Sequence, residues 1–177
     1  MPATDAIDSQ LLDLGLFLIR VVLGLIFAAH GAQKLFGWFG GYGLAGTGGF
    51  LESLGFRPGK WFATMAALAE FTGGLLFALG FLGPVGPALM LSVMTVAMIT
   101  VHRKNPFFVS TNGIEHPLMF ATVAVGIALT GPGRYSLDQA LGDFRLLTPS
   151  ITGIILAVGV IGALANLAMR RNAPAAA

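Results

Sequence analysis

The amino-acid sequence predicts an all-α integral membrane protein, a helical bundle of four core transmembrane helices plus one C-terminal transmembrane helix. Of its 177 residues, 55% are hydrophobic and 10% are charged, and the mean hydropathy is +0.82. A soluble domain usually carries about 25% charged residues, so this composition is typical of a chain that lies in lipid. Apolar stretches close to the roughly 20 residues that a membrane-spanning helix needs recur along the chain, separated by glycine, proline or charged residues.

The same composition excludes several classes of function. The chain has no cysteine, which excludes disulfides, thiolate metal sites and thiol redox chemistry by this chain alone. The net charge of +2 is small and scattered along the sequence, so nucleic-acid binding is not expected.

The first span carries unusual charges. Residues 1–10 are predicted to be a polar tail, and residues 11–32 the first transmembrane helix, with Arg20 about midway, His30 near its far end and Lys34 just beyond. A cation near the bilayer centre costs roughly 2.5–3.5 kcal/mol on insertion scales, so it normally faces protein or water rather than lipid. We therefore expect Arg20 to face a polar partner inside the bundle.

The second span, from about Trp61 to Leu82, contains Glu70. A glycine-rich connection precedes it, in which Thr47 is predicted to cap a short surface helix. One face of the second span combines its carboxylate with small residues: Ala63, Ala66, Ala67, Glu70, Gly73 and Gly74. Because small residues let another helix approach closely, we expect this face to be packed and Glu70 to lie away from lipid.

Two further core spans and one additional span follow. The third covers residues 86–101, and the fourth covers residues 114–130, which the run Gly131-Pro132-Gly133 stops. Ser136 and Gln139 then have capping-box spacing, which predicts a short surface helix.

The last span is predicted over residues 149–169, opened by Thr148-Pro149. A basic and alanine-rich tail, residues 170–177, follows it. The chain is thus divided into the polar tail, a four-helix membrane domain over residues 11–142, the additional helix and the second tail.

Charges flanking the spans predict the orientation. Alternating the five spans puts seven basic residues on one side and two on the other, which by the positive-inside rule places the N-terminus outside and the C-terminus in the cytoplasm. The seven are Lys34, Arg57, Lys60, Arg103, Lys104, Arg170 and Arg171, and the two are Arg134 and Arg145.

This topology gathers the three histidines at the cytoplasmic ends of the spans. His30 ends the first span, His102 ends the third, and Glu115-His116 begins the fourth. Three histidines and a carboxylate could hold a metal ion, but they come from three helix ends without a tight ligand motif. Backbone or lipid phosphate partners are the simpler interpretation, and no metal site is predicted.

The two charges within the spans are predicted to meet. With a rise of about 1.5 Å per residue, Arg20 and Glu70 both fall near the middle of the bilayer. Because an unpaired charge there is costly, an ion pair between antiparallel helices is the economical interpretation. Such a pair either fixes the helix register or forms a polar pocket for a quinone headgroup or small anion, and the two roles are compatible.

At these residues the chain resembles the DoxX family of small bacterial membrane proteins. The resemblance covers about residues 10–142 and rests on short pieces whose order and membrane setting are fairly specific. They are Arg20 with Gly24, His30-Gly31 with Lys34-Leu35, Ala69-Glu70-Phe71, Gly73-Gly74 with Leu79-Gly80, and Gly131-Pro132-Gly133-Arg134 with Ser136-Leu137-Asp138.

The resemblance implies a four-helix membrane bundle, so the fifth span is a departure that could serve docking or assembly. It also implies association with membrane oxidoreductase assemblies, including a subunit of a thiosulfate:quinone oxidoreductase and a complex linked to superoxide and thiol detoxification. The absence of cysteine argues against a thiol-relay role for this chain.

We therefore expect a membrane subunit of a bacterial redox system that binds a quinone or small oxidant in an intramembrane polar pocket of the inner membrane. The catalytic candidates are Arg20, Glu70 and His30, and the cofactor-binding candidates are Lys34, His102, Glu115 and His116. The alternative is a small-solute transporter or channel, or a membrane assembly factor, and whether the chain catalyses a step alone stays open.

The expected partners are the lipid bilayer and, left open by the sequence, redox proteins, a second copy of the chain and a small-molecule ligand. A quinone is the candidate cofactor. A haem held by two histidines is an alternative, although the position of these residues at helix ends argues against a buried haem.

Overall fold

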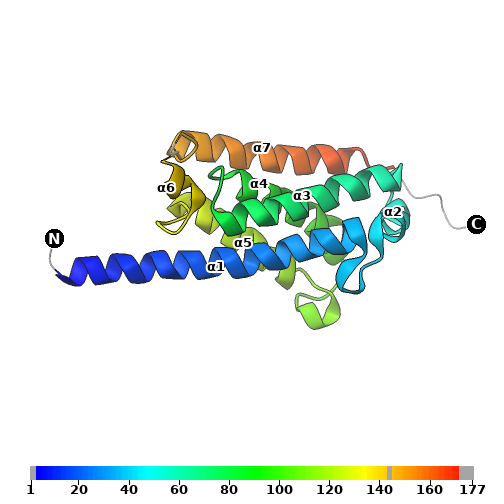
Figure 1. Cartoon of the computed structure of the whole chain (residues 1–177). Coiled ribbons are helices and arrows are strands. Elements are labelled where there is room, and N and C mark those ends of the chain that lie inside the picture. Colours follow the sequence, from blue (N-terminus) through cyan, green and yellow to red (C-terminus); the bar gives the residue numbers. More distant parts are fainter. Residues whose placement is uncertain (1–2, 143–144, 172–177) are drawn as a thin grey trace, which may run out of the picture.

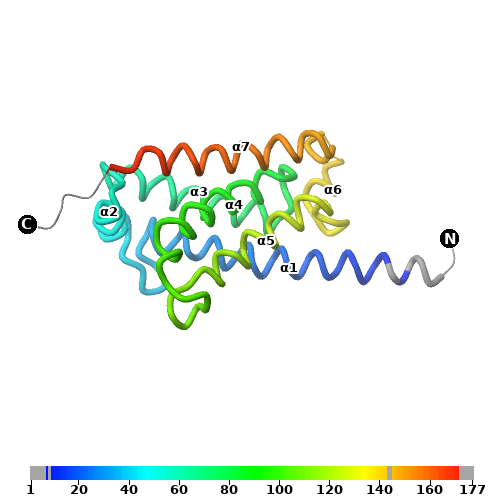
Figure 2. The backbone as a smooth tube through the Cα atoms, turned by 180° about the vertical axis from the view of Figure 1, so that it is seen from behind, coloured from blue at the N-terminus to red at the C-terminus, as the bar shows by residue number. Residues whose placement is uncertain are grey.

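The computed structural model describes residues 3–142 and 145–171, and within these residues it contains helices and no strand. Five long helices run side by side: α1 (Ala3–Phe36), α3 (Gly59–Leu79), α4 (Val85–Ala97), α5 (Glu115–Thr130) and α7 (Pro149–Ala168) (Figure 1). The short helices α2 (Gly43–Ser53) and α6 (Leu137–Leu141) lie at opposite ends of the bundle (Figures 1 and 2). The predicted all-α membrane bundle is confirmed.

Four of these segments are long and apolar enough to cross a membrane. They are Ser9–Phe36, Gly59–Leu79, Val85–His102 and Pro149–Ala168. The third includes a π-helical turn, η2 (Met98–His102), that continues α4. The apolar helix α5 has 16 residues, about 24 Å at 1.5 Å per residue, which is shorter than a hydrocarbon layer of about 30 Å.

The segment predicted to be a polar tail, residues 1–10, is helical where the structure describes it, because α1 begins at Ala3. No glycine or proline interrupts residues 3–14, so a helix formed in the span can continue outward. As a result α1 extends beyond the end of the bundle at which α6 lies (Figure 1). The end of the C-terminal tail, residues 172–177, lies outside the described residues.

The antiparallel helices α1 and α3 approach so closely that three glycines are required. A Cβ on Gly24 would lie 2.7 Å from the backbone of Ala78, and one on Gly31 or Gly74 would enter the backbone of Phe71 or Ala28. The small-residue face predicted for the second span is thus the packed face, with Ala63, Ala67, Glu70, Gly73 and Gly74 buried.

The N-terminal end of α3 contacts α2, and the turn between these two helices contacts the end of α7. Helix α2 begins at Gly43, before Thr47, so the predicted cap at Thr47 is wrong. The exposed Glu52 Oε1 accepts a hydrogen bond of 2.9 Å from Gly59 N and so satisfies a free N–H at the start of α3. The Gly55 carbonyl accepts a 2.9 Å hydrogen bond from the backbone of Arg171, which holds the end of α7 against this turn.

The predicted starts of α6 and α7 are confirmed. Ser136 Oγ accepts a hydrogen bond from Gln139 N, and Thr148 Oγ1 accepts one from Ile151 N. Helix α7 packs on α4, where a Cβ on Gly159 would lie 2.7 Å from the carbonyl oxygen of Ala88. The additional helix is therefore part of the bundle wall.

Candidate functional site

Arg20 is fully buried near the end of the bundle that carries α6. Its Nη1 donates a 3.1 Å hydrogen bond to the carbonyl of Ala78, and its Nη2 donates to the carbonyl of Tyr135. The charge of the buried Asp138 also acts on this guanidinium. Gly80 makes room for it, because a Cβ there would collide with the guanidinium.

Asp138 is a buried carboxylate near Arg20 that the sequence analysis missed as a site residue. Its two carboxylate oxygens accept hydrogen bonds from Leu82 N and Gly83 N, at 2.9 and 2.7 Å, in the turn between α3 and α4. The capping-box spacing of Ser136 and Gln139 signalled a surface helix, and nothing in the local pattern signalled that the carboxylate of Asp138, between them, turns inward. Arg20 and Asp138 therefore join α1, α6 and the α3–α4 turn.

The predicted ion pair between Arg20 and Glu70 is wrong, and the helix register explains why. In the three close contacts between α1 and α3, the two residue numbers add up to 102: Gly24 with Ala78, Ala28 with Gly74, and Gly31 with Phe71. In this register Arg20 lies opposite residue 82 and Glu70 opposite residue 32, which separates the two charges by more than two helical turns.

Glu70 pairs instead with Lys34. The carboxylate Oε2 accepts a hydrogen bond and ion pair from Lys34 Nζ, and the carboxylate side chain is 6% exposed against 29% for the lysine. The same Nζ donates a 3.4 Å hydrogen bond to the carbonyl of His30. This pair lies 14 residues, or about 21 Å, along α1 from Arg20.

Two histidines, His30 and His116, meet beside this ion pair, and His102 lines the same cavity. The rings of His30 and His116 lie edge to face with centroids 5.8 Å apart, and His116 contacts Phe120 at 5.0 Å. His30 Nδ1 donates to Gln33 Oε1 at 3.2 Å, and His102 Nδ1 donates to the carbonyl of Asn112 at 2.8 Å. All three rings are partly buried.

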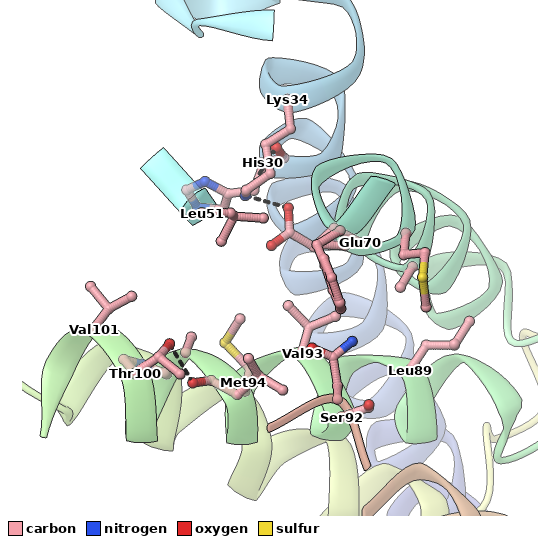
Figure 3. A pocket seen from close by; sticks show the side chains of 18 of the residues that line it. His30, Lys34, Leu51, Glu70, Leu89, Ser92, Val93, Met94, Thr100 and Val101 are labelled. Carbon is pink, nitrogen blue, oxygen red and sulfur yellow. Dashed lines mark hydrogen bonds and ion pairs between the residues drawn. The ribbon is translucent and has the colours of Figure 1, made fainter. Parts of the chain in front are cut away.

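These side chains form the polar end of a cavity of about 750 Å³, which we call the main cavity. Its walls come from α1, α2, α3, α4 with η2, α5 and α7. Figure 3 shows His30, Lys34 and Glu70 grouped on one side and Ser92, Met94 and Thr100 on the other. Most of the lining is apolar and includes Phe27, Met65, Leu68, Leu89, Val93 and Phe120.

The main cavity thus collects five of the seven predicted site residues, and two lie elsewhere. The five are His30, Lys34, Glu70, His102 and His116. Glu115 does not line the cavity, because its Oε2 accepts a 2.7 Å hydrogen bond from Val109 N and holds the preceding loop. Arg20 lies beside a separate space of about 10 Å³. Among the described residues, no group of three His, Asp or Glu side chains is placed to hold a metal ion.

Two polar residues of the main cavity were missed by the sequence analysis. Ser92 of α4 and Asn166 of α7 line it, and neither side chain has a hydrogen-bond partner within the described part of the chain. Asn166 could have been found, because an amide in an otherwise apolar span is costly unless it has a polar partner. Both side chains are available to a ligand.

Comparison with known proteins identifies a matching family and similar bacterial proteins. The model of the family described as DoxX matches residues 15–103, a region that includes His30, Lys34 and Glu70. "Putative oxidoreductase CatD" of Bacillus subtilis is 30% identical over 126 residues, covering 71% of this chain and 86% of that protein. "Inner membrane protein YqjF" of Escherichia coli is 32% identical over 138 residues, covering 75% of this chain and 95% of that protein. No solved structure matches the chain.

Proposed function

The chain belongs to the DoxX family of membrane proteins, and on that premise we propose that it is the quinone-binding membrane subunit of a bacterial redox system. It is a multi-pass membrane protein by its apolar helices. The names of the two relatives, an oxidoreductase and an inner membrane protein, support a redox role and an inner-membrane location for this chain as well.

The observation that carries the proposal is the Lys34–Glu70 pair, with its carboxylate buried, at the polar end of a large apolar cavity. A quinone is likewise polar at one end and apolar along the rest, with carbonyl oxygens on its headgroup and an apolar tail. A lysine ammonium or a histidine N–H can donate to a headgroup carbonyl, while the apolar lining of the cavity accommodates the tail. The proposal moves the pocket from the predicted Arg20–Glu70 pair to Lys34 and Glu70.

Reduction of a quinone to a quinol takes up two electrons and two protons. We assign the electrons to a redox partner protein. The groups that would exchange protons with the headgroup are the Lys34–Glu70 pair and the imidazole of His30, which line the same cavity. Histidine is suited to proton exchange near neutral pH.

Ligand entry is proposed to be lateral, from the lipid. Met65 and Leu68 of α3 line the main cavity and are 43% and 47% exposed, so the cavity opens at the outer surface of the bundle. A quinone dissolved in the bilayer would meet this opening without crossing water.

A photoreactive short-chain quinone tests the proposal. Labelled peptides are expected to contain lining residues of α4 and α7, near Ser92 and Asn166, and excess unlabelled quinone is expected to prevent labelling. Labelling confined to the outer face of α7, at Ile154, Val158 and Ile161, would show partition into lipid instead of binding.

The proposed orientation has the N-terminus outside and the C-terminus in the cytoplasm, with the polar end of the main cavity toward the cytoplasm. The absence of native cysteine allows a direct measurement with single substitutions. In spheroplasts, a membrane-impermeant maleimide should label Gln139→Cys of α6 and should label Ser110→Cys only after permeabilisation. The opposite pattern would reverse the orientation.

A further inference from the structure

A second cavity, of about 380 Å³, lies where α2, η2 and α7 end. We call it the basic cavity, because three of its lining residues are cationic and none is acidic. Its lining residues are Ser53, Leu54, Ile99, Thr100, Lys104, Leu167, Arg170 and Arg171. The sequence analysis treated these cations only as signals of helix ends and orientation.

The backbone around the basic cavity is held in place. Arg171 N donates a 2.9 Å hydrogen bond to the Gly55 carbonyl, and Arg170 Nε donates one of 2.9 Å to the Leu54 carbonyl. The Arg170 guanidinium also lies 5.5 Å from the centroid of the Phe56 ring. Arg170 is therefore fixed with its two terminal nitrogens free of hydrogen bonds within the described residues.

The other two cations have no partner among the described residues. Neither the Lys104 ammonium nor the Arg171 guanidinium makes a hydrogen bond or an ion pair there. Three like charges around one cavity repel one another unless an anion joins them. Of the apolar lining residues, Ile99 and Leu167 belong to membrane-spanning segments and so extend toward lipid.

From this arrangement we propose that the basic cavity binds the phosphate headgroup of an anionic phospholipid, whose acyl chains lie along Ile99 and Leu167. Basic pockets between transmembrane helices suit such headgroups. Arginine offers paired N–H donors that match phosphate oxygens, and lysine adds a third charge. The hydroxyl groups of Ser53 and Thr100 lie in the same lining but already donate to the carbonyls of Phe50 and Val96, so the three cations are the donors for the phosphate. This site is independent of the quinone proposal.

The bound lipid would connect three elements that end at this cavity. Lys104 follows η2, Arg170 and Arg171 follow α7, and Ser53 ends α2. A ligand that binds only the folded bundle stabilises it by mass action. We therefore expect the anionic lipid to raise the thermal stability of the purified protein.

The experiment compares the wild-type protein with the double variant Lys104→Gln/Arg171→Gln in nanodiscs of phosphatidylcholine with or without phosphatidylglycerol. Arg170 is left in place because it also supports the fold. Native mass spectrometry should find phosphatidylglycerol retained by the wild type, with affinity lower by roughly tenfold or more in the double variant. The melting temperature should rise with phosphatidylglycerol in the wild type only.

The matched control is Arg103→Gln, an exposed cation next to Lys104 that does not line the basic cavity. It should retain the lipid as the wild type does. Two results would contradict the proposed site: equal retention of phosphatidylglycerol by the wild type and the double variant, or a loss of phosphatidylglycerol in Arg103→Gln as large as in the double variant. Stabilisation by inorganic phosphate as strong as that by the lipid would assign the site to free phosphate and overturn the lipid proposal. Equal melting temperatures of both proteins in phosphatidylcholine alone would establish that the double variant is folded.

Discussion

Replacing Glu70 by glutamine is expected to leave the protein in the membrane at wild-type abundance while lowering quinone reduction by roughly 100-fold or more, the usual scale of a lost proton-transfer group. Glutamine keeps the size of the side chain and an oxygen for Lys34, but it carries no charge and exchanges no proton. The measurement is the reduction of a short-chain quinone by host membranes that lack the native gene and carry the variant.

The matched control for this prediction is Glu115→Gln. Glu115 is a carboxylate on the neighbouring helix α5 that bonds to Val109 N and does not line the main cavity. It should keep wild-type activity. If Glu70→Gln loses activity only in proportion to its abundance, the Lys34–Glu70 pair is structural, and the assignment of Glu70 to proton transfer is wrong.

Arg20→Leu is expected to abolish accumulation of folded protein. The substitution leaves Asp138 buried without its cation and the carbonyls of Ala78 and Tyr135 without their donor. Breaking a buried charge interaction in this way costs roughly 3–5 kcal/mol, which is a large part of the stability of a typical domain. Membrane abundance and resistance to protease measure the effect.

Two companion variants test the mechanism behind that loss. Gly80→Ala should destabilise the protein for the same reason, since its Cβ would occupy the place of the guanidinium and Gly80 has a φ of +61°. Arg57→Gln, at an exposed arginine, should have no effect. Folded, abundant Arg20→Leu protein with lowered quinone reduction would contradict a structural role and return Arg20 to the catalytic candidates.

The sequence predicted which face of the second span is packed, but it did not predict how far one helix is shifted along another. The period of small residues around Glu70 is a property of one helix, and it correctly placed the carboxylate inside. The offset between α1 and α3 depends on which glycines of the two helices meet, Gly24 and Gly31 with Gly74 and its neighbours. The offset is a property of the contact between two helices and cannot be derived from the pattern of either helix alone. The sequence analysis therefore assigned Arg20 the wrong partner.

The histidine cluster was predictable for a different reason. Helix ends that share one side of a membrane must lie at similar depth, so His30, His102 and His116 were expected together. Glu115 shows the limit of this argument, because adjacent residues on a helix point about 100° apart. With His116 directed into the main cavity, Glu115 is directed toward the preceding loop.

The measurement that tests the central claim most directly is quinone photolabelling of Ala97→Phe. Ala97 lines the main cavity, and phenylalanine there fills space without changing Lys34 or Glu70. Competable labelling of the α4 and α7 peptides should disappear in Ala97→Phe and persist in Ala165→Phe, whose site is exposed on α7 outside the lining. Unchanged competable labelling of folded Ala97→Phe would contradict the assignment of the main cavity as the quinone site.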